Sequence, residues 1–201
     1  MKAISISKGN TKLGNIPNVS LPPGPQWSCR ADAPCYNTTC YAKKAWRQYP
    51  GTRAAWTRNW DTWQKQPASY EQQINDYLSK YKPPWFRWHA AGDIPSQEYF
   101  RMMTRVCDTH PKTKFLVYTK RYEFDLEHAC ANLSVIYSRW PGLPFPDTLA
   151  HKAQAHYEDD KTTTLEREGA SPCPGSCAQC KKCWALATGN SNKGHVLFHA
   201  H

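Results

Sequence analysis

The chain of 201 residues lacks any run of about twenty apolar residues, the length needed to cross a bilayer. Its first residues, Met1 to Ser7, lack the long apolar core of a secretory signal. No Gly-rich phosphate-binding loop of either standard pattern is present. We therefore expect one cytoplasmic, monomeric domain spanning residues 1–201, with no membrane association.

Acidic residues are scarce relative to basic ones, with 16 Asp and Glu against 26 Lys and Arg and a formal net charge of +10. A charge of this size suits an anionic partner such as nucleic acid, or simply a basic surface. Several of the nine tryptophans adjoin basic residues, as in Trp46-Arg47 and Arg87-Trp88. Such pairs stack on bases in some proteins and pack as cation–π contacts in others, and the sequence leaves both readings open.

Cysteine is abundant, and its nine copies cannot all pair as disulfides. Cys107 and Cys130 each stand alone in a predicted amphipathic helix, where we expect a small buried hydrophobe rather than a ligand. The other seven form two groups. The upstream group is Cys29, Cys35 and Cys40, and the downstream group is Cys173, Cys177, Cys180 and Cys183.

The numbers of thiols in the two groups suggest iron–sulfur chemistry. Four thiolates complete the ligand set of a [4Fe–4S] cluster or a structural zinc ion, whereas three leave one iron of a cluster open. We therefore expect a closed cluster on the downstream group and an open cluster on the upstream group. A single mixed site that draws on both groups is the alternative. Zinc is the second choice of metal, because zinc sites usually separate two Cys-x2-Cys pairs with a spacer.

Apolar periodicity predicts alternating strands and helices. Strands are expected at 2–7, 85–91, 115–119, 133–138, 148–153 and 196–198, and helices at 52–65, 69–81, from 95 onward and at 124–131. This order predicts an α/β fold: a partial, open TIM-type barrel of about five to six mostly parallel strands, with outer helices. Loop-rich cysteine segments lie at both ends, an N-terminal cluster loop at 1–46 and a cysteine-rich segment at 170–201.

Polar residues follow two neighbouring predicted strands. Gly92 and Asp93 come after the strand at 85–91, and Lys120 and Arg121 after the strand at 115–119. Reactive sites of parallel sheets lie at the carboxyl ends of the strands. These four residues are therefore candidates to line a site. From the residues alone, Asp93 could instead cap the helix after Pro95, and Lys120 and Arg121 could belong to a solvated loop.

The order of the motifs resembles the bacteriophage gene-product-88 family. The matching features are Gly9 to Gly14, the Cys-x5-Cys-x4-Cys-Tyr-Ala run, Arg87 to Ile94, Tyr118-Thr119-Lys120, and the closing Cys-Pro…Cys-x2-Cys-x2-Cys-Trp. Together they cover most of the chain. A phage-encoded chain would work in the cytoplasm of the host cell.

Proteins of this family look similar to radical S-adenosylmethionine (SAM) enzymes, in which three cysteines hold a [4Fe–4S] cluster whose open iron binds SAM. The loop here is longer than the usual Cys-x3-Cys-x2-Cys of those enzymes. The resemblance implies that Gly92 and Asp93 form the turn beside the SAM amino group, with Asp93 accepting from the ammonium. It also implies that Lys120 or Arg121 meets the SAM carboxylate.

Three functions follow from these features. The first is a radical-SAM-like enzyme whose substrate and catalytic residues the sequence does not name. The second is a metal-stabilised, basic phage protein that contacts nucleic acid. The third is an electron-transfer or redox-sensing protein that has clusters but no SAM chemistry. Histidines add less: we expect His89 to be packed or hydrogen-bonded, and no ligand count requires His195, His199 or His201.

Overall fold

The computed structural model describes residues 3–127, 129–157, 170–186 and 194–198. In this part of the chain eight strands form one sheet, in the order β1-β2-β3-β4-β5-β6-β8-β7. The strands are β1 (Ile6–Ser7), β2 (Asn18–Val19), β3 (Trp85–Trp88), β4 (Lys114–Thr119), β5 (Leu133–Arg139), β6 (Gln154–Tyr157), β7 (Ala170–Pro172) and β8 (His195–Phe198). All neighbours are parallel except β1 and β2.

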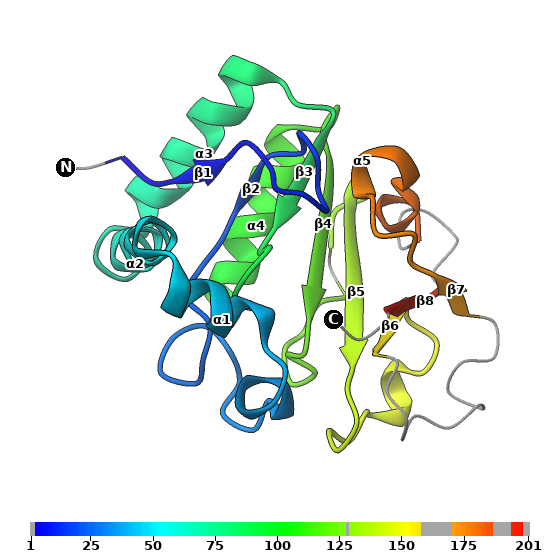
Figure 1. Cartoon of the computed structure of the whole chain (residues 1–201). Coiled ribbons are helices and arrows are strands. Elements are labelled where there is room, and N and C mark those ends of the chain that lie inside the picture. The colour runs from blue at the N-terminus through cyan, green and yellow to red at the C-terminus, as the bar shows by residue number, and fades with distance from the viewer. Residues whose placement is uncertain (1–2, 128, 158–169, 187–193, 199–201) are drawn as a thin grey trace.

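Five α-helices accompany these strands in the described ranges, and Figure 1 shows α2, α3 and α4 beside the β1–β4 half of the sheet. The helices are α1 (Tyr41–Gln48), α2 (Pro50–Lys65), α3 (Pro67–Tyr81), α4 (Gln97–Thr109) and α5 (Cys177–Cys180). Short 3-10 turns lie at η1 (Pro34–Asn37), η2 (Asp147–Leu149) and η4 (Lys182–Trp184). None of these helices is both long and apolar enough to cross a membrane.

Local sequence explains where the long helices begin and end. Proline occupies the first turn of both α2 and α3, where its missing N–H leaves no intrahelical bond unmade. The Ser96 side chain accepts a hydrogen bond from Tyr99 N (3.2 Å) and caps α4. Lys82 ends α3 in the left-handed conformation, and two prolines follow it.

The two faces of the sheet carry different cores, because side chains alternate along each strand. Phe86 and Trp88 of β3 pack with Phe115 and Val117 of β4 in the core that includes α3 and α4. The intervening Leu116 belongs to a second core, with Ile136 of β5 and Trp184 of η4 among its other members. The C-terminal cysteine segment therefore lies on the sheet face opposite the long helices.

The expected α/β class with an open, mostly parallel sheet is confirmed. The count of five to six strands is too low, because β2 and β7, with only two and three residues, were not predicted. β1 and β7 are the edges of the sheet, so no strand pairing closes a barrel within the described residues.

Two local predictions are wrong. The predicted helix at 124–131 is irregular over its described residues, because the Gln97 side chain binds both backbone groups of Asp125, at 3.0 Å from the N–H and 2.7 Å from the carbonyl. The strand predicted at 148–153 begins later, as β6, after the short turn η2.

Candidate functional site

The upstream cysteines lie on a loop, residues 21–40, here called the N-terminal thiol loop. It runs beside the ends toward which β3 and β4 point (Figure 1). Leu21 N donates to Ala91 O (3.1 Å), and Asp93 N donates to the Ser28 hydroxyl (3.0 Å). Arg30 Nη1 donates to Lys120 O (2.8 Å). The carboxyl ends of two strands therefore hold this loop, as the strand-end prediction required.

Gly92 makes this contact sterically feasible. Its φ is +83°, and a Cβ added there would lie 2.5 Å from Ser28 Oγ and 2.8 Å from Leu21 O. Only a residue without a side chain accepts both the left-handed backbone and this close approach. In this structure Gly92 therefore supports the seating of the loop on β3.

The three upstream thiols share one environment. Burial raises the pKa of Cys29 to about 12, and the nearby Asp93 carboxylate and the Cys35 and Cys40 thiols add to that rise. Burial also raises the pKa of Cys35, while the Lys120 ammonium opposes the rise. The loop therefore brings Cys29, Cys35 and Cys40 together beside Asp93 and Lys120.

Backbone N–H groups point at two of these sulfurs. Gly24 N donates to Cys29 Sγ at 3.3 Å, and Lys43 N donates to Cys40 Sγ at 3.4 Å. The second bond caps the start of α1, so Cys40 is fixed by the helix that follows it. The bond from Gly24 favours the thiolate of Cys29, and the thiolate is the form that binds metals.

Asp93 is buried and extensively hydrogen-bonded. Its Oδ1 accepts from Thr119 Oγ1 (2.6 Å) and Ile94 N (2.8 Å), and its Oδ2 accepts from Lys120 N (2.9 Å). Burial raises the pKa of Asp93, and these bonds oppose the rise. The carboxylate thus joins the ends of β3 and β4, while Ser96 caps the following helix.

Lys120 and Arg121 differ in what they leave for a ligand. Arg121 donates to Ile94 O (2.9 Å), Ser28 O (3.1 Å) and Glu123 Oε1 (3.0 Å). Its guanidinium is therefore already hydrogen-bonded to the N-terminal thiol loop and to the turn after β3. Lys120 Nζ lies 5.1 Å from the centre of the Trp140 ring, and its charge acts on Cys35. Lys120 is therefore the better placed of the two to meet an anion beside the thiols.

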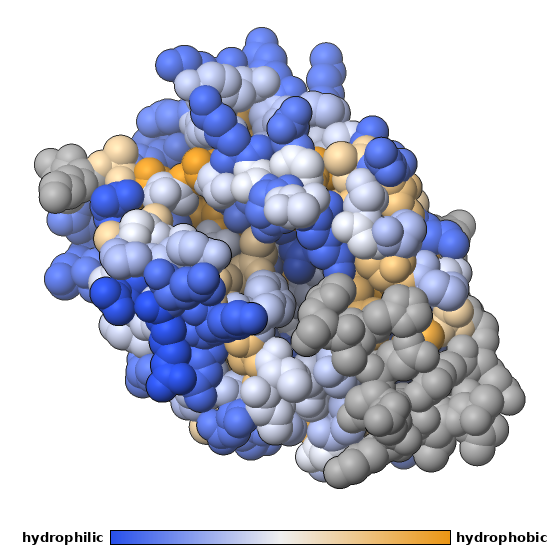
Figure 2. Space-filling model, in the orientation of Figure 1, coloured by the Kyte–Doolittle hydropathy of each residue, from blue (hydrophilic) through white to orange (hydrophobic). Residues whose placement is uncertain are grey.

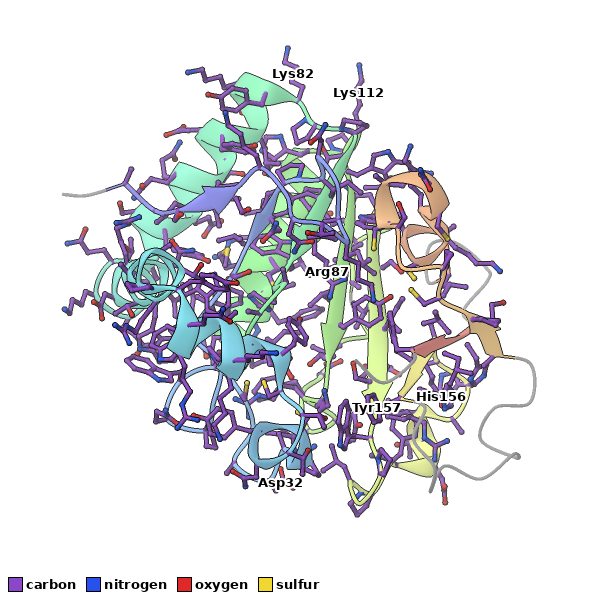
Figure 3. The ribbon with its side chains drawn as sticks, in the orientation of Figure 1. Asp32, Lys82, Arg87, Lys112, His156 and Tyr157 are labelled. Carbon is purple, nitrogen blue, oxygen red and sulfur yellow. The ribbon has the colours of Figure 1, made fainter. Side chains whose placement is uncertain are left out.

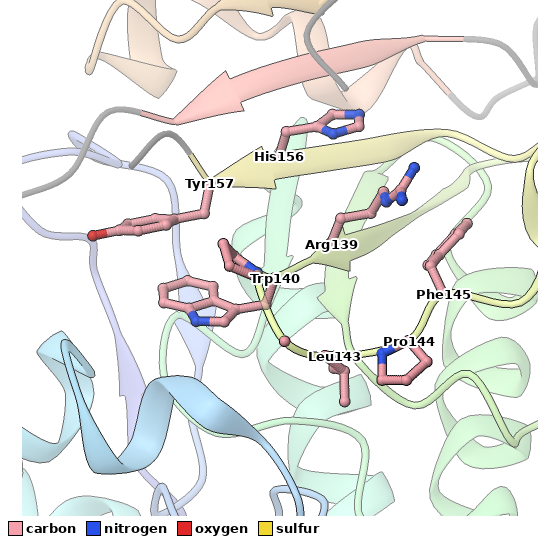
Figure 4. Close-up of a pocket in the computed structure, with 9 residues that line it drawn as sticks. Arg139, Trp140, Leu143, Pro144, Phe145, His156 and Tyr157 are labelled. Carbon is pink, nitrogen blue, oxygen red and sulfur yellow. The ribbon is translucent and has the colours of Figure 1, made fainter. Parts of the chain in front are cut away.

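A pocket of about 370 Å³ lies at the ends of β5 and β6 and includes Trp140 (Figure 4). Trp140 stacks on Tyr157 with ring centres 4.1 Å apart, and Arg139 and His156 line the same pocket. Burial, His195 and Arg139 lower the pKa of His156 to about 4. The sequence patterns did not indicate this pocket.

The downstream cysteines lie in residues 173–184, here called the C-terminal thiol segment. Two backbone bonds hold it, from Cys177 N to Lys12 O and from Cys173 N to Leu197 O, both 2.8 Å. Trp184 is buried in the core, and its indole N–H donates to Phe86 O (3.2 Å). Figure 1 shows α5 near the start of β4, away from the N-terminal thiol loop.

Cationic and phenolic groups face this second set of thiols. Burial raises the pKa values of Cys177 and Cys183, while the Arg87 guanidinium opposes the rise at both. The Tyr118 hydroxyl also hydrogen-bonds Cys183, which favours the thiolate. Arg87 lies between the two cysteine-bearing regions (Figure 3), and its charge also acts on Tyr41 beside the upstream thiols.

The thiols that most affect each other's pKa belong to the same group. Cys29 and Cys35 respond to upstream thiols, whereas Cys177 and Cys183 respond to Cys173 and, for Cys183, to Cys180. This arrangement favours two sites over one mixed site. Cys180 is the one exposed member of the seven.

The described residues contain no group of three or more Cys, His, Asp or Glu side chains placed to hold a metal ion. Tetrahedral zinc with Zn–S bonds of about 2.3 Å needs its sulfurs about 3.8 Å apart. In a [4Fe–4S] cluster each thiolate binds a different iron, so the sulfurs of its ligands lie farther apart than those around a single zinc ion. Within the described ranges neither thiol group is arranged as a preformed metal site.

The remaining cysteines and histidines have other partners. Cys107 is buried, and burial together with a hydrogen bond to the Cys130 thiol raises its pKa. Cys107 and Cys130 therefore contact each other within the core. His89 Nε2 lies 3.0 Å from the Tyr99 hydroxyl, as expected for a packed histidine. His195 Nδ1 lies 2.8 Å from His156 Nε2. His199 and His201 lie outside the described residues.

The fold and these groups define an α/β protein with two separate thiol sites on one open sheet. The family model of gene product 88 matches residues 3–186, and the chain belongs to this phage-associated family. The chain matches no curated protein and no solved structure.

Proposed function

We propose that this protein is an iron–sulfur protein whose reactive site is the N-terminal thiol loop. The observation that carries the proposal is that the loop bearing Cys29, Cys35 and Cys40 is held against the carboxyl ends of β3 and β4, with Asp93 and Lys120 near enough to act on its thiols. A [4Fe–4S] cluster held by three thiolates has one open iron, and when bound it supplies one-electron chemistry to a ligand such as SAM.

The protein's own groups have distinct roles in this proposal. Gly92 and Asp93 hold the loop against the strand ends, and Arg121 ties Ser28 to the turn after β3. Lys120 meets the anionic part of the ligand, such as the carboxylate of SAM. Asp93 keeps free acceptor capacity only on Oδ2, which is the atom available to a ligand ammonium.

The C-terminal thiol segment is proposed to hold an auxiliary, closed cluster. Its four thiols are seated by buried Trp184 and by backbone bonds to residues distant in sequence, which suits a centre that also stabilises the fold. A reducing cytoplasm would keep all seven thiols available.

Anaerobic reconstitution with iron and sulfide tests this assignment. Two [4Fe–4S] clusters predict about eight irons per chain, and a Cys29→Ala/Cys35→Ala/Cys40→Ala variant should retain about four. Incubation of the wild-type protein with SAM and dithionite should release 5′-deoxyadenosine. Protein purified with zinc and unable to take up iron would overturn the proposal. Intact clusters without SAM cleavage would leave an electron-transfer or redox-sensing function.

A further inference from the structure

Half of the chain's net charge is concentrated in two consecutive helices. The segment 41–65, which comprises α1 and α2, contains six cationic residues and one acidic residue, so its formal charge is 6 − 1 = +5 of the total +10. The cations are Lys43, Lys44, Arg47, Arg53, Arg58 and Lys65, and the acid is Asp61. Figure 2 shows strongly hydrophilic surface gathered over this region.

A groove of about 730 Å³ follows α2 from end to end. It is lined by residues at positions 50, 53, 54, 57, 58, 61, 62 and 65, the spacing of one helix face, with Trp46 of α1 and Gln73 of α3 on its sides. The 16 residues of α2 span about 24 Å at 1.5 Å per residue. An elongated ligand therefore fits this surface better than a compact one.

The cations of the groove are not neutralised by the protein. In the described part of the chain, no acidic side chain lies within ion-pair distance of Arg53, Arg58 or Lys65. The Nε atom of Arg58 is buried without a hydrogen-bond partner there. Asp61 is the one acid in the lining, so the groove has a net positive charge.

Exposed aromatic rings accompany these charges. Tyr41 is 64% exposed and Tyr49 is 53% exposed, and they lie at the two ends of α1. Among the described residues only one other large hydrophobic side chain, Tyr81, is comparably exposed. The Tyr41 hydroxyl donates to Ala90 O, which leaves the exposed ring near the end of β3. Exposed rings on the helix that leads into a cationic groove are surfaces on which unpaired bases can stack while their phosphates meet the cations.

We infer that the groove along α2, with Tyr41 and Tyr49, binds a single-stranded nucleic acid. Phosphates meet Arg53, Arg58 and Lys65, and bases stack on the exposed tyrosines. Because Tyr41 lies beside the upstream thiols, a strand that stacks on it also reaches them. This second step rests on the proposed function and names single-stranded nucleic acid as the substrate class of that site.

Fluorescence anisotropy with a fluorescein-labelled, mixed-sequence single-stranded DNA of 20 nucleotides tests the inference. Contacts by three cations predict that log K falls with log salt concentration with a slope of about −2 between 50 and 200 mM NaCl. Arg53→Glu/Lys65→Glu should weaken binding at least tenfold at 50 mM salt and flatten the slope. Asp61→Asn should strengthen binding about two- to threefold, because it removes the one repulsive charge.

Lys82→Glu/Lys112→Glu is the matched control, since it makes the same charge change far from α1 (Figure 3). It should leave the affinity within about twofold. Equal weakening by the two double variants would show a non-specific charge effect and overturn the inference. So would tighter binding to the duplex of the same sequence, or binding to phosphatidylserine vesicles without binding to the DNA.

Iron content separates this inference from the proposed function. The Cys29→Ala/Cys35→Ala variant, which keeps the Cys40 cap of α1, should bind the DNA as the wild type does, and Arg53→Glu/Lys65→Glu should reconstitute with the same iron content as the wild type. Wild-type protein that binds iron but not the DNA would overturn only the inference. DNA binding by a protein that takes up no iron would support the inferred nucleic-acid groove and overturn the proposed iron–sulfur function.

Discussion

The two thiol sites are attached to the sheet by different means. The N-terminal thiol loop contacts the strand ends through backbone hydrogen bonds, the Asp93 carboxylate and the close approach at Gly92. The C-terminal thiol segment buries a whole indole, Trp184, in the second core. The first attachment depends on polar geometry and the second on apolar area, so the two sites should respond differently to the same kinds of change.

Their surroundings differ in the same sense. Asp93 and Lys120 stand beside the upstream thiols, and the pocket that contains Trp140 adjoins them. The downstream thiols face Arg87 and Tyr118. A site for reaction needs ligand-binding groups and space, whereas a supporting centre needs a fixed position. This difference is consistent with the proposed division, in which the loop is the reactive site and the segment supports the fold.

The largest effect should come from the apolar anchor. Trp184→Ala should lower the free energy of unfolding of the metal-free protein by about 3–5 kcal/mol, because it leaves a cavity in the core. Trp27→Ala, in the other region, should have a smaller effect because that ring is only half-buried. Urea unfolding monitored by circular dichroism measures both. Equal losses would remove the distinction between the two attachments.

Two glycines in the left-handed conformation allow a matched test of the polar attachment. Gly92→Ala should destabilise the protein by about 3 kcal/mol for two reasons. The added methyl group would clash with Leu21 O and Ser28, and alanine disfavours the positive φ at this position. Gly175→Ala, in the C-terminal thiol segment, meets nothing within 4 Å and should cost only about 1–2 kcal/mol. Gly92→Ala should also lower the iron content of the upstream site. A loss at Gly175 as large as that at Gly92 would contradict the close-approach argument.

Acid should lower the free energy of unfolding through His89, which follows β3 near the upstream site. Burial lowers the pKa of His89 to about 3, so the unfolded chain binds the proton first as the pH falls below about 6.5. The contribution of His89 to the free energy of unfolding should therefore be fully present above pH 6.5. It should fall by about 1.4 kcal/mol per pH unit between pH 6.5 and 3.

Urea unfolding at a series of pH values measures the slope. His89→Gln can keep the hydrogen bond to Tyr99 without the titration, so it should lose this share of the slope. An unchanged slope in that variant would show that His89 does not carry the effect.

The smallest effects should come from single thiols in metal-free protein. Cys35→Ala and Cys180→Ala should each change the free energy of unfolding by about 1 kcal/mol or less, because neither side chain is fully buried. In the reconstituted protein Cys180→Ala should lower Tm more than Cys35→Ala, which should mainly reduce SAM cleavage. Differential scanning calorimetry of loaded samples compares them, and equal shifts would contradict the division of roles.

Local signals were sufficient to predict the long elements. Ile74, Tyr77, Leu78 and Tyr81 recur at helical spacing and predicted α3, although only Ile74 and Leu78 of these four are buried and Tyr81 is exposed. Apolar runs marked β3, β4 and β5. The short strands β2 and β7 were missed because their pairing depends on distant partners rather than on a pattern of their own. The false helix at 124–131 failed for a similar reason: its competitor, the Gln97 side chain, is 28 residues away.

The candidate site shows the same limit. Cysteine spacing and strand-end position selected residues of the loop and of the strand ends that contact it, while the grouping into three and four ligands stays a prediction. Spacing could not show that Thr119 binds Asp93, or that the Arg121 guanidinium serves the loop rather than a ligand. Those contacts exist only once β3 and β4 lie side by side.

The position of β8 bears on the order in which the molecule can assemble. β7 pairs only with β8 among the described strands, and β8 also pairs with β6, although β8 follows both in the chain. During synthesis, the edge of β6 and the Cys173 backbone must therefore wait for residues 195–198 before they are paired. A chain ending at residue 186, where the family match stops, would contain all seven grouped thiols. It would lack the pairing of β7 with β8 and the bond from Cys173 N to Leu197 O, which fix the start of the C-terminal thiol segment.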